Sequence, residues 1–373
     1  MDIRPKTRIQ LYQIVVITVF WVMCGAYFAL YKCVTYDLLS DTFKFMVPHH
    51  LSLGKFFIIN LIGPAIGGLI GGSVIVFRLN EKYRNRSYRY YLVISILYFF
   101  GFIFSINSFM LYQFYYKNRI LNSEDSLQEA INLLVLDPYA IRNLVSWMII
   151  VFFTLHGLKI YEKFGPGTLF SMFLGKFHRP QEVHRVFMFL DLTGSTTIAE
   201  KIGHSRYFAL LRDFYNNITD SILNSHGSIY QYVGDEIIIS WPEMKASLRN
   251  SNCINCFFKI EDAIMQNQPY YLKEYGIVPV FKAAVHKGEV VIGEIGIIKR
   301  EIVYSGDILN TTSRMMEQCS VYNEKLIISR DILDITNGNA DYTMGLLGNM
   351  TLRGKLKPLE LYGVKRNHIP VLS

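Results

Sequence analysis

Four long apolar stretches in the first 161 residues place the strongest constraint on how this chain folds. A helix needs roughly 20 residues to cross the hydrocarbon core of a bilayer, and each stretch approaches or exceeds that length with no charged residue near its centre. They are Leu11–Tyr31, Phe56–Phe77, Tyr91–Tyr115 and Leu144–Tyr161. No small-residue cleavage site follows the first stretch, which is also too long for a signal peptide. We therefore expect an all-α transmembrane domain of four helices over residues 1–161.

The charged residues beside these stretches predict an orientation in the membrane. Basic residues precede the first stretch and fill the second connection, whereas acidic residues predominate in the first and third connections. Because cytoplasmic loops are enriched in Lys and Arg, both termini are expected in the cytoplasm. Much of the formal net charge of +8 is explained by this topology. A lipid bilayer is therefore the expected partner, and no nucleic-acid partner is implied.

Three smaller features in the sequence allow both a structural and a functional interpretation. The glycines of Gly63–Gly72 are spaced to let a second helix approach closely, although a ligand or lipid could occupy the same face. His156, the one ionisable group deep within a span, is expected to be a hydrogen-bonded packing residue rather than a haem ligand. Cys253 and Cys256 lack a second pair at zinc spacing and are expected to pack on a helix.

Residues 184–373 alternate between strand and helix patterns. Expected strands are Arg185–Leu192, Ser228–Val233, Glu236–Trp241, Val278–His286, Val290–Ile297 and Glu301–Tyr304. One helix is expected to follow a cap at Ser195 or Thr196, and a second to span Ala246–Gln266. This order fits an α+β sandwich with its helices on one face of the sheet.

Two carboxylates occupy positions that such a sheet can bring to one edge. Asp191 ends the first strand, and Asp235 lies in the Gly-Asp turn expected between the next two. Paired carboxylates can hold divalent cations against a nucleoside triphosphate. Between the first strand and its helix, the segment Thr193–Thr196 is expected to offer free backbone N–H groups to phosphates.

Three separated fragments together resemble the catalytic half of class III nucleotidyl cyclases. The matching patterns are Asp191-x-x-Gly-x-Thr196, Val233-Gly-Asp235 and Gly306-Asp-x-x-Asn310-x-x-x-Arg314. The resemblance covers roughly residues 184–365 and implies a ferredoxin-like palm fold for the domain 184–373. It also implies that residues 162–183 form a linker that transmits the state of the membrane part, although a plain tether is the alternative.

The resemblance implies a role for each matching residue. Two Mg²⁺ or Mn²⁺ ions per site would be held by Asp191, Leu192 and Asp235. Asn310 would orient the ribose, and Arg314 would stabilise charge on the α-phosphate. Phosphate-binding residues would be Thr193, Gly194, Ser195, Thr196, Arg353 and Lys355.

The family's sites form at a head-to-tail dimer interface, with the carboxylates and the Asn/Arg pair on different protomers. Because this chain carries both sets, a homodimer with two equivalent sites is implied. The expected reaction converts a purine nucleoside triphosphate to a 3′,5′-cyclic nucleotide and pyrophosphate. The expected location is the inner (plasma) membrane of a cell, with an unknown membrane or periplasmic stimulus.

The two positions that read the base depart from the family pattern. Gln231 and Val303 stand where adenine-selective members carry Lys and Asp or Thr, and the Glu and Cys of guanine-selective members are also absent. ATP is the expected substrate because members of the family generally use it, and GTP is the alternative. A nucleotide-binding receptor without activity is a further alternative. A diguanylate cyclase is disfavoured, because Val233 replaces the first glycine of its hairpin pattern.

Overall fold

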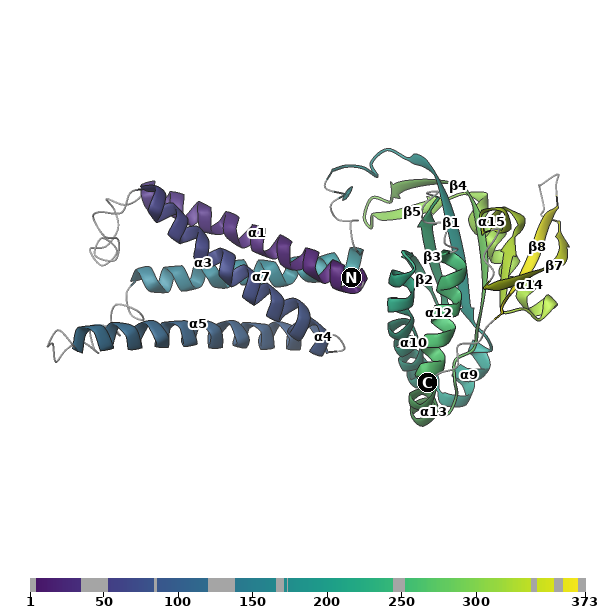
Figure 1. Ribbon diagram of the computed structural model, residues 1–373, viewed down its shortest axis with the longest axis horizontal. Coiled ribbons are helices and arrows are strands. Elements are labelled where there is room, and N and C mark those ends of the chain that lie inside the picture. The colour runs from purple at the N-terminus through teal and green to yellow at the C-terminus, as the bar shows by residue number, and fades with distance from the viewer. Residues whose placement is uncertain are drawn as a thin grey trace. The chain divides into compact units, whose positions relative to one another are not determined.

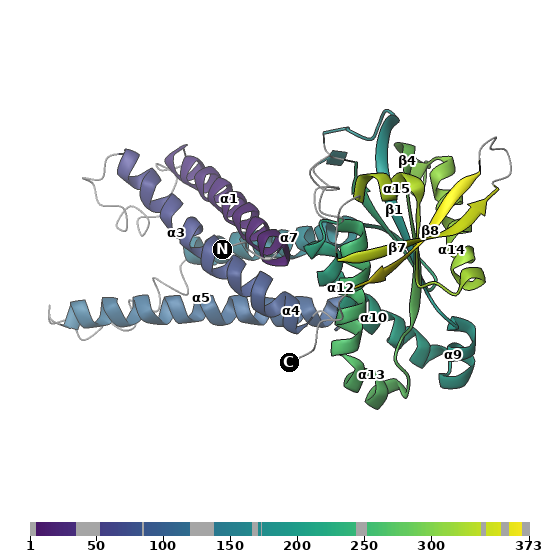
Figure 2. The ribbon, with the colours of Figure 1, turned by 45° about the vertical axis from the view of Figure 1, so that its right-hand side comes forward.

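The computed structural model describes residues 5–34, 53–83, 86–119, 138–165, 171–172, 174–243, 252–336, 341–351 and 358–367. The chain divides into two compact units, one of Thr7–Leu169 and one of Phe170–Ser373 together with Met1–Lys6. The first unit is a set of helices and the second is a sheet with helices packed on it (Figures 1 and 2).

Four long helices make up the described part of the helical unit. They are α1 (Pro5–Val34), α3 (Leu53–Ser73), α5 (Tyr88–Arg119) and α7 (Pro138–Phe164), and α3 continues through a π-helix, η2 (Val74–Leu79), into α4 (Asn80–Lys82). Lys6–Tyr31, Asn60–Lys82 and Leu144–Lys163 are long and apolar enough to cross a membrane. The apolar stretch of α5, Tyr88–Phe102, is shorter. By length and composition, the described residues thus support three of the four expected spans.

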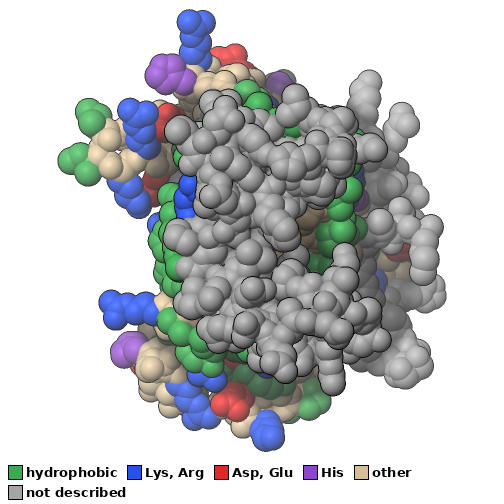
Figure 3. Space-filling model, turned by 90° about the vertical axis from the view of Figure 1, so that its left-hand side faces the viewer, with side chains coloured by type: hydrophobic (Ala, Val, Ile, Leu, Met, Phe, Trp, Pro, Cys, Tyr) green, Lys and Arg blue, Asp and Glu red, His purple; other side chains and the backbone are tan. Residues whose placement is uncertain are grey.

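Large apolar side chains lie on the outside of these helices. Val15, Val19 and Met23 of α1 are all more than half exposed, as is Phe153 of α7. In the space-filling view of Figure 3, hydrophobic side chains reach the surface beside the residues that are not described. Apolar side chains exposed along three long helices are compatible with a lipid environment.

The glycine-rich face of α3 packs on α1, as its spacing predicted. A Cβ atom added to Gly68 would lie 2.7 Å from the Cα of Thr18, and one added to Gly71 would lie 3.4 Å from the ring of Trp21. The absence of side chains on this face therefore brings the two helices into close contact. The predicted helix contact is confirmed within the chain.

Replacing Gly68 with alanine should destabilise the helical unit, because the new methyl group meets backbone atoms that cannot rotate away. Overpacking of this kind costs about 1–3 kcal/mol. The matched control is Gly157→Ala, since a Cβ atom there meets nothing within 4 Å. The thermal midpoint of the full chain in detergent should fall for Gly68→Ala and not for Gly157→Ala. Equal midpoints for the two variants would contradict the close contact.

Two polar side chains inside the helical unit have hydrogen-bond partners. The indole N–H of Trp21 donates to the hydroxyl of Thr154 at 3.0 Å, which joins α1 to α7. His156 Nδ1 is 3.0 Å from the carbonyl oxygen of Phe152, and its ring lies between those of Phe152 and Tyr88. The environment of His156 is thus the hydrogen-bonded packing that its sequence context predicted.

The second unit contains a mixed sheet in the order β2-β3-β1-β4-β6-β8-β7, with β5 paired to β4. The one parallel pair among its described strands is β4 with β6. The strands are β1 (Gln181–Leu192), β2 (Ser228–Val233), β3 (Glu236–Pro242), β4 (Phe281–Ile295), β5 (Glu301–Ser305), β6 (Leu326–Ser329), β7 (Tyr342–Met350) and β8 (Leu359–Arg366). The helices are α9 (Ser195–Ile202), α10 (His204–Asn224), α12 (Asn252–Gln266), α13 (Gln268–Tyr275), α14 (Asp307–Tyr322) and α15 (Arg330–Thr336).

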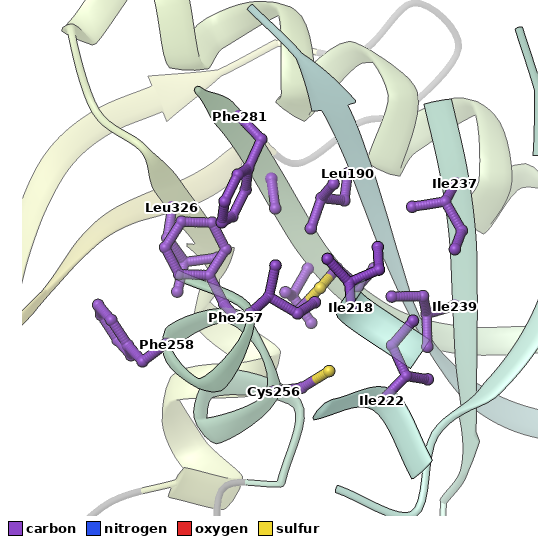
Figure 4. Close-up of a cluster of buried hydrophobic side chains, with 14 of the residues drawn as sticks. Leu190, Ile218, Ile222, Ile237, Ile239, Cys256, Phe257, Phe258, Phe281 and Leu326 are labelled. Atoms are coloured by element: carbon purple, nitrogen blue, oxygen red, sulfur yellow. The ribbon is translucent and has the colours of Figure 1, made fainter. Parts of the chain in front are cut away.

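Helices cover both faces of this sheet, so the expectation that they lie on one face is wrong. Leu190 and its even-numbered neighbours in β1 pack with α10 and α12, as Figure 4 shows for Leu190, Ile218 and Phe257. The alternate residues Phe187 and Phe189 pack with α14 instead. Because side chains alternate along a strand, a fully apolar β1 requires a cover on each side.

Two local predictions need correction, and a third is tested only in part. The two strands expected over Val278–Ile297 form one continuous strand, β4, because its residues pair with β1 from Phe281 to Ile292 without interruption. The helix α9 begins at Ser195 with Gly194 as its N-cap and no side-chain cap, so neither Ser195 nor Thr196 caps it. The expected helix Ala246–Gln266 is described from Asn252 onwards.

The two cysteines of α12 are core residues. Cys253 and Cys256 are both 1% exposed or less and pack in the cluster drawn in Figure 4. Burial raises the pKa of each thiol to about 12. Both therefore remain protonated at neutral pH, which disfavours a metal or redox role.

Candidate active site

The sheet brings Asp191 and Asp235 together at one end of β1. Asp191 pairs with Glu236 of β3 on one side and with Lys282 of β4 on the other. Asp235 lies in the two-residue turn between β2 and β3, where Gly234 adopts a φ of +64°. The two aspartate carboxyl groups are close enough to share a hydrogen bond. The predicted meeting of the two carboxylates is therefore observed.

The electrostatics of this carboxylate pair favour a cation. Burial first, and then the charge of Asp235, raises the pKa of Asp191 to about 6. Burial, followed by the charges of both aspartates, raises the pKa of Glu236 to about 7. Lys282 opposes the shift at Asp191, and a backbone hydrogen bond from Leu192 does so as well. Several acidic groups thus share one half-buried space, and a divalent cation would relieve their repulsion.

The donor set fits Mg²⁺ or Mn²⁺. Hard cations bind carboxylate and carbonyl oxygens, and Mg²⁺ is commonly held by one or two carboxylates together with substrate phosphates. Leu192 has a buried side chain, so only its backbone can reach this space. Among the described residues, no group of three or more His, Cys, Asp or Glu side chains is arranged to hold a metal by itself. A cation here would therefore depend on the nucleotide for part of its coordination.

The raised pKa values predict how stability without metal depends on pH. In the folded protein Asp191 and Glu236 hold their protons more tightly than in the unfolded chain, so folding is favoured by low pH. Their contribution is present below about pH 4 and is lost as the pH rises through about 6 to 7.

The expected loss is on the order of 1 kcal/mol, because both groups are partly solvated. Thermal midpoints of the full chain in EDTA should fall from about pH 5 to about pH 7.5 less steeply in Asp191→Asn than in the wild type. Asp220→Asn, at an exposed position of α10, should retain the wild-type slope. Parallel slopes for wild type and Asp191→Asn would contradict the crowding of these carboxyl groups.

The segment expected to bind phosphates turns directly beside Asp191. Gly194 has a φ of +72°, which lets the chain leave β1 and start α9 at Ser195. The first N–H groups of a helix have no partner within the helix, so Ser195 and Thr196 present donors at its start. Thr193 differs from the expectation of free N–H groups, because its N–H donates to the carbonyl of Val280 at 2.8 Å. Arg353 and Lys355 lie outside the described residues.

Two tyrosine side chains of α10 also lie beside the carboxylate pair. The hydroxyl of Tyr215 donates to the carbonyl of Gly234 at 3.2 Å. Tyr207 lies near Ser195, and burial, followed by the charge of Asp235, raises its pKa. Both rings therefore border the space in which the aspartates meet.

The two positions predicted to read the base are linked through their neighbours. Gln231 is exposed on β2 and Val303 is half-buried on β5. The N–H of Tyr304 donates to the hydroxyl of Tyr230 at 3.1 Å, and the two rings meet edge-on at 4.9 Å between centroids. A bulge between Ile229 and Gln231 interrupts the pairing of β2 with β3. The structure thus ties β2 and β5 together beside the positions that the sequence assigns to the base.

Asn310 and Arg314 lie one turn apart on the exposed side of α14. The opposite side of this helix, which includes Ile308, Met315 and Cys319, is buried against the sheet. Within the described part of one chain, neither the Asn310 nor the Arg314 side chain forms a hydrogen bond or ion pair. Both side chains are therefore exposed on the described surface of α14.

Sequence reasoning missed four residues at this site. Glu236 directly follows Asp235, and its position in the hairpin was a signal that could have been used. Tyr207 and Tyr215 are eight residues apart on one predicted helix, which puts them on one face. Lys282 lies within an expected strand, but its place opposite Asp191 follows from strand pairing that the sequence alone does not give.

Comparisons with known proteins agree with this geometry. Residues 179–366 match the family described as the adenylate and guanylate cyclase catalytic domain. Adenylate cyclase 2 of Rhizobium meliloti is 38% identical over 176 residues, which are 47% of this chain and 48% of that protein. Adenylate cyclase 1 of the same organism is 22% identical over 182 residues, or 48% of this chain and 27% of that protein. The chain thus spans half or less of the length of these relatives.

A solved structure shares the fold. A bacterial light-regulated adenylyl cyclase aligns with a TM-score of 0.50 and 18% sequence identity, covering 65% of this chain and 66% of that one. At this identity the likeness concerns the fold alone.

Proposed function

Because the chain belongs to the class III adenylate and guanylate cyclase family, we propose that it is a membrane-anchored cyclase that converts ATP to 3′,5′-cyclic AMP and pyrophosphate. The observation that carries this proposal is the approach of the Asp191 and Asp235 carboxyl groups beside the start of α9. A nucleoside triphosphate needs such a site for its metal ions and phosphates at once.

Each residue of the site has a proposed task. Asp191, the Leu192 backbone and Asp235 would hold two divalent cations, which would supply Lewis-acid activation of the ribose 3′-hydroxyl and charge neutralisation on the phosphates. Gly194, Ser195 and Thr196 donate backbone N–H groups to the outer phosphates. The N–H of Thr193 is already hydrogen-bonded, so this residue helps to position the segment and donates no backbone N–H to the phosphates. Arg353 and Lys355 are proposed as further phosphate-binding cations.

A second copy of the chain completes each site in this proposal. Asn310 and Arg314 are exposed and lack side-chain partners among the described residues, so they are available to a neighbouring protomer. From there Asn310 orients the ribose and Arg314 stabilises the charge that develops on the α-phosphate. A head-to-tail homodimer then has two equivalent sites, and the monomer is inactive.

The base is proposed to be adenine, and guanine is the alternative. Two relatives bear the name adenylate cyclase, which favours ATP. Gln231 can donate or accept a hydrogen bond and so can face either purine, whereas Val303 can do neither. A receptor that binds nucleotide without turning it over is the second alternative.

The helical unit is proposed to anchor the enzyme in the inner membrane. Three spans are supported by length and hydropathy, and we propose α5 as the fourth. An even number of spans would place both termini on the same side of the membrane, and the basic residues of the second connection favour the cytoplasm, where the nucleotide is. The helical unit would then receive the membrane or periplasmic stimulus and pass it through the linker 162–183.

The test is an assay of the full chain with Mn²⁺, supplying ATP and GTP separately. We expect cyclic AMP and pyrophosphate from ATP in equal amounts. Cyclic GMP as the main product would establish the guanylate alternative. Bound nucleotide without any cyclic product, in a protein shown to be dimeric, would overturn the enzymatic proposal and favour the receptor.

A further inference from the structure

Tyr215 of α10 contacts the turn that carries Asp235 in two ways. Its hydroxyl donates to the carbonyl oxygen of Gly234, and its ring packs against the ring of Tyr232 at 4.6 Å between centroids. Gly234 and Tyr232 come one and three residues before Asp235. A single side chain of α10 therefore restrains both the end of β2 and the turn that follows.

The hydrogen bond acts on the peptide group that precedes Asp235. That group is planar, so fixing the direction of the Gly234 carbonyl also fixes the nitrogen and Cα of Asp235. The pairing of Val233 with Glu236 closes the turn, and the Tyr215 hydroxyl adds a restraint from outside the hairpin. The direction of the Asp235 side chain thus depends in part on a contact made from a separate helix.

The hydroxyl of Tyr215 is suited to this task throughout the physiological pH range. Burial, followed by the negative charge of Asp235, raises its pKa, so the hydroxyl keeps the proton that it donates. A phenylalanine at this position would keep the ring contact with Tyr232 and lose only the hydrogen bond.

We propose that Tyr215 is a positioning residue of the metal site, whose hydroxyl aims Asp235 toward Asp191 and thereby sets the affinity for the divalent cations. This proposal rests on the proposed function, since it assumes that the two carboxylates bind metal. Tyr215 itself contacts neither metal nor substrate. The side chain acts through the Gly234–Asp235 peptide, and its effect is confined to how well the carboxylate pair is preorganised.

The experiment measures Mn²⁺ binding directly, in full-length protein with 3′-deoxy-ATP, by the electron paramagnetic resonance signal of free Mn²⁺. Tyr215→Phe should raise the dissociation constant for Mn²⁺ by about three- to tenfold, as expected for one lost hydrogen bond. The kcat at saturating Mn²⁺ should stay close to that of the wild type. A purely structural role would instead lower the thermal midpoint and leave Mn²⁺ affinity unchanged.

The matched control is Tyr275→Phe, which removes a hydroxyl that donates to Asp213 of α10 at 2.6 Å. This variant should bind Mn²⁺ as the wild type does. Unchanged affinity in Tyr215→Phe, or equal weakening in both variants, would overturn the proposal. Asp191→Ala distinguishes failure of the Tyr215 proposal from failure of the proposed function. Unchanged Mn²⁺ binding in that variant would mean that the proposed metal site itself is wrong.

Discussion

Replacing Asp191 with alanine should reduce cyclic nucleotide formation by about a thousandfold or more. The carboxylate lies at the end of β1 between Glu236 and Lys282, in contact with Asp235. Its loss would remove a proposed ligand of the divalent cations, and metal activation of a hydroxyl contributes several kcal/mol to such reactions. The measurement is the initial rate of the full chain with Mn²⁺ and ATP.

Two comparisons make this result interpretable. Asp220→Ala removes an exposed aspartate of α10 that lies outside the proposed site and should leave the rate unchanged. The thermal midpoint of Asp191→Ala in EDTA should not fall, because the removed carboxyl group is one that repels its neighbours. A folded Asp191→Ala protein with more than about a tenth of wild-type activity would contradict the role given to this residue.

Mixing two inactive variants should restore activity. In the proposed dimer the carboxylates come from one protomer and Arg314 from the other, so Asp191→Ala and Arg314→Ala damage opposite halves of a site. When both chains are co-expressed in equal amounts, half of the dimers contain one of each. Each mixed dimer keeps one undamaged site out of two, which gives about a quarter of the wild-type activity.

The control for this experiment pairs two variants with damage in the same half. Asp191→Ala co-expressed with Asp235→Ala leaves no undamaged site in any dimer and should stay inactive. Recovery in this control, or no recovery with Arg314→Ala, would mean that the site is assembled differently. The result therefore tests whether Asn310 and Arg314 act on the partner, which the exposed side of α14 suggests.

The elements nearest the proposed chemistry were predictable because local rules determine them. The apolar run Arg185–Leu192 forms the C-terminal part of β1, and the Gly234-Asp235 pair forms the turn between β2 and β3. The spacing of Asn310 and Arg314 required only that α14 be helical. Glycines four apart in α3 likewise predicted a close helix contact, which α1 provides.

The features that the sequence did not reveal depend on contacts between distant segments. Residues 287–289 were expected to separate two strands, yet β1 is long enough to pair across them and keep β4 continuous. Gly288 lies beneath α14, where an added Cβ atom would lie 3.4 Å from the side chain of Ile308. The position of α14 opposite α10 and α12 follows from the burial of β1 on both faces. The composition of β1 alone does not distinguish burial on two faces from burial on one.

The segment before β1 is hydrogen-bonded to the far end of β4. The N–H of Glu294 donates to the carbonyl of Phe177 at 3.1 Å, and a Cβ atom on Gly293 would lie 3.4 Å from Pro180. In the same region Gly293 pairs with Val303 of β5. For protein engineering, this means that a chimaera with a foreign sensor should be joined upstream of Phe177. A junction placed inside Phe177–Pro180 would remove the contacts that hold the end of β4, and β4 pairs there with β5.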